Sequence, residues 1–249
     1  MNQPINLVNV YQDTRDFFLK NHLYAGKSIK YTFDYIYKEF SDEVSKNIIK
    51  PKEGQCIIKV VNQDTLLATR EYIHPFVMNF ASDYHPGGGV NGGARAQEEE
   101  LFRRTNYFTS LNKKFVEYPL VENEVVFTPN ILILKDEKYN HLPAMKPIDC
   151  LAVAAIRHPK LNDNNKYNMN DKTLMLRKME SMYQLGILYN HDTLILGAFG
   201  CGVFRNPPHE VASIFKELND KYKVYYKNIV FAIIGDNNYN IFKGIIEKR

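Results

Sequence analysis

Short apolar runs recur along the chain from residue 55 onward, and longer segments that mix apolar and polar positions separate them. A short continuous apolar run is typical of a strand that is covered on both faces, as in a parallel sheet. Strands that alternate with helices indicate helical layers on both sides of one sheet. We therefore expect an α/β protein, a three-layer α/β/α sandwich whose central sheet is mixed and mostly parallel.

The same pattern assigns a residue range to each element. The predicted strands are residues 56–61, 75–80, 125–127, 131–134, 148–156, 193–197 and 229–234. The predicted helices are residues 14–21, 33–40, 65–72, 94–111, 171–189, 207–222 and 239–247. Residues 1–50 are polar and aromatic and contain only two of these helices. We interpret residues 1–50 as an N-terminal helical accessory segment and residues 51–249 as the main domain.

Composition narrows the class of protein further. The 249 residues suit one large α/β domain, and a net charge of +4 is too small to indicate a nucleic-acid-binding protein. The cysteines Cys56, Cys150 and Cys201 are far apart in sequence, which argues against a disulfide framework or a cysteine zinc site. The N-terminus lacks signal-peptide features, and no apolar run approaches the roughly 18 residues of a membrane span. We expect a soluble intracellular protein, in the cytoplasm or the nucleus.

A glycine-rich loop follows the predicted strand at residues 75–80. Gly87, Gly88 and Gly89 are consecutive, and two more glycines follow closely. Glycine lets the backbone adopt positive φ and lets a ligand approach the main chain, so successive N–H groups can converge on phosphate oxygens. The next helix would point its positive N-terminal end at the same place. A flexible surface turn explains a triple glycine equally well.

Three glutamates lie early in the helix after this loop, and acidic residues at such positions often face solvent. Leu101 and Phe102 must face the core. Helical spacing places Glu98 on their side and Glu99 at its edge, whereas Glu100 is expected to face solvent. A carboxylic acid in a partly dry cleft can protonate the leaving oxygen of a riboside. Glu98 and Glu99 are therefore a candidate acid pair.

A second glycine-rich loop follows the predicted strand at residues 193–197 and precedes a helix. Ligands of open α/β sheets bind beyond the carboxyl ends of strands, so we expect both loops to form one site. Phe204 suits either packing on a sugar or base or an ordinary core position. Cys201 has no histidine or aspartate placed by sequence to activate it, so we interpret it as a small buried residue rather than a nucleophile.

The first loop and its helix resemble the microbial-type poly(ADP-ribose) glycohydrolases, a branch of the macrodomain fold. Seven residues separate the triple glycine from Gln97, Glu98 and Glu99, which is similar to the spacing of that family. Residues 79–82, residues 101–104 and the second loop also look like the family. The similarity is expected to run from about Val60 to the C-terminus, so that residues 51–249 would be a macrodomain-like catalytic domain.

The resemblance implies a glycosidase that releases ADP-ribose from the chain end of poly(ADP-ribose), with no metal or cofactor. It implies that Glu99 protonates the leaving ribose oxygen and then activates water. Glu98 would hold the ribose hydroxyls beside the bond that breaks. The residues implied to bind substrate are Asn79, Ser82, Gly87, Gly88, Gly89, Val90, Gln97, Gly200, Cys201, Gly202, Val203 and Phe204.

Three other functions would use the same loops. A hydrolase of single ADP-ribose units on protein or nucleic acid would use the same pocket, and a non-catalytic ADP-ribose reader would not require the glutamate pair. A nucleotide-phosphate enzyme would need the lysine of a P-loop, which is missing. The expected partners are poly(ADP-ribose) or ADP-ribosylated macromolecules, with ADP-ribose as product. We expect a monomer with no membrane contact and no sequence-specific nucleic-acid binding.

Overall fold

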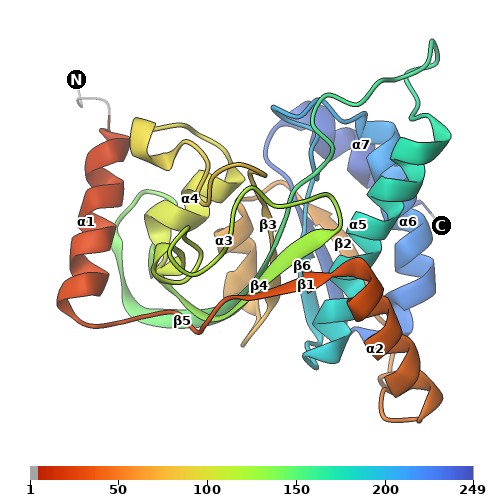
Figure 1. The fold of residues 1–249 in the computed structure, drawn as a ribbon, viewed down its shortest axis with the longest axis horizontal. Helices are drawn as coiled ribbons and strands as arrows, with labels where there is room; N and C mark the ends of the chain where they lie inside the picture. Colours follow the sequence, from red (N-terminus) through yellow and green to blue (C-terminus); the bar gives the residue numbers. More distant parts are fainter. Residues whose placement is uncertain (1–4, 249) are drawn as a thin grey trace. The chain divides into compact units, whose positions relative to one another are not determined.

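The computed structural model describes residues 5–248, and Figure 1 shows the order of their helices and strands. Residues 1–4 of the predicted accessory segment and residue 249 of the predicted main domain lie outside the described residues. The helices are α1 (Leu7–Lys20), α2 (Phe33–Ser45), α3 (Thr65–Ala68), α4 (Gln97–Arg104), α5 (Met169–Leu188), α6 (Pro208–Tyr222) and α7 (Asp236–Ile246). The strands are β1 (Ile29–Thr32), β2 (Ile57–Val61), β3 (Phe76–Phe80), β4 (Glu124–Lys135), β5 (His141–Val153), β6 (Thr193–Leu196) and β7 (Asn228–Ala232).

The strands form one seven-stranded sheet in the order β1-β4-β5-β3-β6-β7-β2. The pairs β3–β6, β6–β7 and β7–β2 are parallel, whereas β4 and β5 are antiparallel. Every residue of β6 is buried, and so are four of the five residues in both β3 and β7. This burial is what continuous apolar runs predict. The mixed, mostly parallel sheet confirms the α/β prediction.

Strand β4 differs from the prediction of two short strands on either side of Pro129. The structure has one strand with an irregular register between Thr128 and Ile131. Asn130 lies in this bulge with a φ of 55°. A bulge is one of the few places where a sheet tolerates proline, so the strand continues through a residue that usually ends one.

Helix α4 is shorter than the predicted helix at residues 94–111. It ends at Arg104 because Thr105 is extended, with φ −138° and ψ 172°. The Thr105 hydroxyl donates to Leu101 O at 2.6 Å and accepts from Tyr107 N at 3.1 Å. A single 3-10 turn, Tyr107–Thr109, follows. The short strand β1 was not predicted, and none of its four residues is fully buried.

The described chain forms two compact units. The first contains residues 5–30 and 79–154, and the second contains residues 31–78 and 155–248. In the first unit, α1 packs against α4 (Figure 1). In the second unit, α5 packs against α2 and α6, and α6 packs against α7. The two helices of the predicted accessory segment thus belong to different units.

A membrane-spanning segment was not expected. None of the helices within residues 5–248 is long and apolar enough to cross a membrane.

Candidate active site

The first glycine loop closes around the carboxyl groups of Glu98 and Glu99. Gly87 N donates to Glu98 Oε1 at 3.1 Å, and Gly89 N donates to Glu99 Oε1 at 2.9 Å. Gly88 between them has a φ of 55°, and a Cβ atom there would collide with Glu99 Oε1. Glycine is required at this position because the carboxylate fills the space of a side chain.

Glu98 is anchored by three N–H donors. Its Oε2 accepts from Ser82 N at 2.7 Å, and its Oε1 accepts from Gly87 N and from Asn79 Nδ2, the latter at 3.3 Å. The side chain is 3% exposed. Burial raises the pKa of Glu98 to about 8, against the opposing effect of these donors, and the nearby Glu99 raises the pKa further. Glu98 is held in one place, and Oε2 retains a lone pair for a further donor.

Glu99 has a different environment. Its Oε1 accepts from Gly89 N, while its Oε2 is buried and has no hydrogen-bond partner within residues 5–248. A buried polar atom without a partner is unusual and needs a physical explanation. A proton donor or acceptor for a substrate needs one oxygen that the protein does not use. Of the two glutamates, Glu99 is the one that keeps an oxygen without a partner in the described chain.

The other predicted residues of this segment lie around the pair. Asn79, on β3, is fully buried, and its Oδ1 has no hydrogen-bond partner in the part of the chain described. Gln97 Oε1 accepts from Phe80 N at 2.9 Å and so joins the start of α4 to β3. The Ser82 hydroxyl accepts from the N–H groups of the next turn at 3.2 Å. The structure therefore brings together Asn79, Ser82, Gln97 and the glycine loop.

The N–H groups of the first loop are engaged within the protein. Gly88 N donates to His85 O at 3.0 Å and Val90 N to Gly87 O at 3.1 Å, while Gly87 and Gly89 donate to the carboxylates. Val90 is buried. The loop therefore shapes and orients the acid pair in this conformation. Its direct contact with a diphosphate stays a prediction.

Glu100 was expected to face solvent, but the structure turns its side chain toward the protein. Its side chain is 23% exposed and pairs with Arg103, with Nη1 to Oε1 at 2.7 Å. The Tyr139 hydroxyl donates to the same oxygen at 3.0 Å. Arg103 is fully buried and also donates to Ala94 O. A buried guanidinium needs a counter-charge and acceptors, which is why Glu100 turns toward the protein.

Helix α1 is joined to α4 and to the end of β4 through contacts that the sequence did not indicate. The buried Thr14 hydroxyl donates to Arg103 O at the end of α4. Lys135, 2% exposed, donates to Val10 O at 3.0 Å and pairs with Asp13 at 2.6 Å. A buried threonine and a buried lysine carry no sequence signal that distinguishes them from surface residues. Arg103, Thr14 and Lys135 were therefore missed.

The second glycine loop belongs to the second unit and is organised by Asn206. Asn206 Nδ2 donates to Gly200 O at 3.1 Å and to Ile156 O at 2.8 Å, and its Oδ1 accepts from the Tyr167 hydroxyl at 2.7 Å. Gly200 has a φ of 71°, and a Cβ there would press on Asn206 and Ala155. Asn206 lies two residues after Phe204, and an asparagine beside a glycine-rich turn is a sequence signal for this role.

Two predicted residues of this loop have distinct surroundings. Phe204 is half-buried rather than part of the core, and the Arg157 guanidinium lies 4.2 Å from its ring centroid. Cys201 Sγ donates to Phe199 O at 3.5 Å. Burial raises the pKa of the Cys201 thiol to about 12. The thiol is protonated at neutral pH and is not an activated nucleophile, as the sequence indicated.

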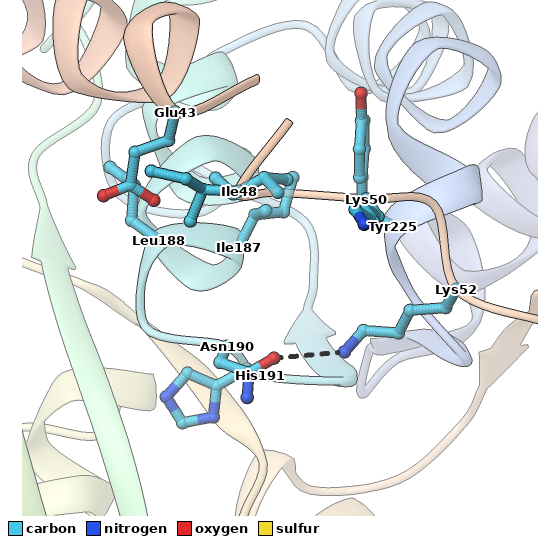
Figure 2. A pocket seen from close by; sticks show the side chains of 10 residues that line it. Glu43, Ile48, Lys50, Lys52, Ile187, Leu188, Asn190, His191 and Tyr225 are labelled. Carbon is cyan, nitrogen blue, oxygen red and sulfur yellow. Dashed lines mark hydrogen bonds between the residues drawn. The ribbon is translucent and has the colours of Figure 1, made fainter. Parts of the chain in front are cut away.

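A cavity of about 410 Å³ lies elsewhere in the second unit (Figure 2). Its wall includes Lys52, His191 and Tyr225, which precede β2, β6 and β7 respectively. The second glycine loop follows the carboxyl end of β6. The cavity is thus at the amino ends of these parallel strands, whereas ligands of α/β sheets bind beyond the carboxyl ends. None of the predicted site residues lines it.

Solved structures share this fold. The poly(ADP-ribose) glycohydrolase from Thermomonospora curvata is 21% identical, with a TM-score of 0.79 over 95% of this chain and 97% of that chain. The same enzyme bound to the inhibitor ADP-HPD gives a TM-score of 0.78 at 21% identity, with the same shares covered. The enzyme from Deinococcus radiodurans in complex with ADP-ribose gives 0.76 at 21% identity, over 99% of each chain. No curated protein sequence matches the chain significantly.

Two buried glutamates lie behind a triple glycine on an α/β fold that bacterial glycosidases share. The model of the microbial-type PARG (poly(ADP-ribose) glycohydrolase) catalytic domain matches residues 8–136, just over half of the chain. The chain belongs to the microbial-type PARG family. Because the match begins at residue 8, the expectation that the similarity starts near Val60 is wrong. The Thr14 bond to α4 gives the physical reason, since α1 supports the acid pair's helix.

Proposed function

We propose that the chain hydrolyses the ribose–ribose O-glycosidic bonds of poly(ADP-ribose) and releases ADP-ribose, acting from the chain end. Membership of the PARG family supports the reaction. The single observation that supports the site is the buried Oε2 of Glu99, which has no partner among the described residues and lies beside a firmly anchored Glu98. Hydrolysis of single ADP-ribose units would use the same two glutamates. Analysis of the reaction products distinguishes this activity from hydrolysis of the polymer.

Glu99 would act first as acid and then as base. Its Oε2 carries the proton that moves to the leaving ribose oxygen as the glycosidic bond breaks, and positive charge develops at the anomeric carbon. Glu99 then takes a proton from the water that attacks this carbon. Each cycle adds one water, shortens the polymer by one unit and returns Glu99 to its protonated form. Glu98 would accept a ribose hydroxyl at Oε2 and hold the bond in place.

The remaining contacts form part of the same proposal. In the first unit, Asn79, Ser82 and Gln97 would contact the ribose, and residues 87–90 would contact the diphosphate. In the second unit, residues 200–203 would bind the diphosphate and Phe204 would hold the terminal ribose. The reaction would need no metal or cofactor. We retain residues 51–249 as the catalytic domain and assign residues 1–50 a supporting role, which the Thr14 contact favours. The chain would act as an intracellular monomer on ADP-ribosylated macromolecules.

The test is product analysis on two substrates side by side. Purified protein is incubated with poly(ADP-ribose) and with a protein that carries single ADP-ribose units, and the products are separated by chromatography. The proposal predicts free ADP-ribose from the polymer and no release of the single units. Release from the singly modified protein alone would assign the mono-ADP-ribosyl activity instead.

A further inference from the structure

The second glycine loop exposes backbone donors that the protein does not use. Gly202 and Val203 are exposed, Val203 at 72%. Within residues 5–248, the N–H groups of Gly202, Val203 and Phe204 donate to no acceptor, whereas Arg205 N donates to Gly202 O at 3.0 Å. Consecutive backbone N–H groups without an acceptor in the protein can bind an anion. The first loop differs, because its N–H groups are engaged internally.

Arg157 brings a positive charge to the same loop. Its guanidinium lies over the Phe204 ring, 4.2 Å from the centroid. His158 N donates to Phe204 O at 2.9 Å and fixes the segment of Arg157 beside the loop. A guanidinium carries five N–H donors, so contact with a ring does not use up its capacity to bind an anion. The side chain is exposed and is positioned by the ring.

We infer that Arg157 is a substrate-binding residue whose guanidinium pairs with the diphosphate of ADP-ribose at the N–H groups of residues 202–204. The inference rests on the proposed function for the identity of the anion. A guanidinium forms two parallel hydrogen bonds with phosphate oxygens, which an ammonium does not. Arg157 therefore contributes charge and orientation, and Phe204 holds it in place.

The test compares Arg157→Met and Arg157→Lys with the parent. Affinity for ADP-ribose is measured by calorimetry at low and high salt, and KM and kcat are measured on poly(ADP-ribose). Loss of a charge-assisted contact predicts a Kd and a KM raised about 10-fold to 100-fold in the Met variant, with kcat changed less than about threefold. The Lys variant recovers part of the affinity. The salt dependence of the Kd weakens in the Met variant only.

Arg177→Met is the matched control. Arg177 is also an exposed guanidinium in the second unit, lies 5.7 Å from the Phe33 ring centroid and pairs with Asp34. Its removal should leave the ADP-ribose affinity unchanged. If the parent hydrolyses the polymer and Arg157→Met binds ADP-ribose as tightly as the parent, the inference is wrong and the proposed function stands. If the parent neither binds ADP-ribose nor hydrolyses polymer, both are wrong.

Discussion

At the scale of single residues, two adjacent glutamates acquire different chemistry from the donors around them. Glu98 accepts three N–H groups, whereas Glu99 accepts one and keeps Oε2 unpaired within the described chain. Pairs of titratable groups in unlike environments are a common basis for dividing acid and positioning roles. The difference in hydrogen bonding follows from the path of the glycine loop between the two carboxyl groups.

The raised pKa of Glu98 predicts a pH-dependent stability. Its folded pKa of about 8 exceeds its ordinary value of 4.5, so the folded state binds the proton more tightly than the unfolded state. The contribution of the Glu98 carboxyl to the free energy of unfolding is fully present below about pH 4.5 and is lost as the pH rises through about 8. We expect the free energy of unfolding of the parent to fall relative to that of Glu98→Gln between pH 5 and 8, in urea titrations.

The control for this titration is Glu217→Gln, since Glu217 is exposed on α6. The curve of Glu217→Gln should run parallel to that of the parent at every pH. Parallel curves for the parent and Glu98→Gln would show that Glu98 titrates normally, which would contradict the effect of burial described above.

The burial of the two glutamates is predictable from the sequence, but the surroundings of their neighbours are not. Helical spacing relative to Leu101 and Phe102 predicts that Glu98 faces inward and that Glu99 lies at the edge, and both are buried. The prediction that Glu100 faces solvent is wrong because Glu100 pairs with Arg103, and the sequence does not reveal that Arg103 is buried. The backbone N–H groups that donate to Glu98 are placed by the conformation of the loop and of residue 82. The identity of the residues does not determine that conformation.

At the scale of elements, the glycine loop is the part whose sequence is most constrained by its neighbours. Gly88→Ala combines strain at positive φ, about 1–2 kcal/mol, with a collision against Glu99 Oε1. We expect kcat on poly(ADP-ribose) to fall about 100-fold, because displacement of a catalytic group by about 1 Å has that effect. Steady-state kinetics of the purified variant measure the change.

Gly92→Ala is the control within the same loop. A Cβ atom at Gly92 has nothing within 4 Å, so its kcat should stay close to that of the parent. If Gly88→Ala retained the parent kcat, the fit of the loop around Glu99 would have no bearing on catalysis.

The elements themselves were predictable where their packing is simple. The apolar runs predict β3, β6 and β7 because these strands are covered on both faces. Helix α1 begins earlier than predicted, and the signal was present in Asn6, whose Oδ1 accepts from Val8 N at 3.0 Å and from Asn9 N at 3.2 Å. Strand β1 has no fully buried residue, so no apolar run marks it.

At the scale of the whole molecule, the chain has the fold of the solved bacterial enzymes, and its match to the family model begins at residue 8. The sequence indicated the family from one loop and one helix. The grouping of α1 with α4 is a long-range contact between residues 14 and 103, and local periodicity carries no information about such pairs.

The most direct test of the account is the activity of Glu99→Gln on poly(ADP-ribose), beside the parent and Glu217→Gln. The amide keeps the shape of the side chain but cannot donate a carboxylic proton. Loss of general acid catalysis predicts a kcat lower by about 10²–10⁴-fold, with ADP-ribose binding by calorimetry retained and Glu217→Gln as active as the parent. Turnover of Glu99→Gln at the parent rate would contradict the assignment of Glu99 as the acid.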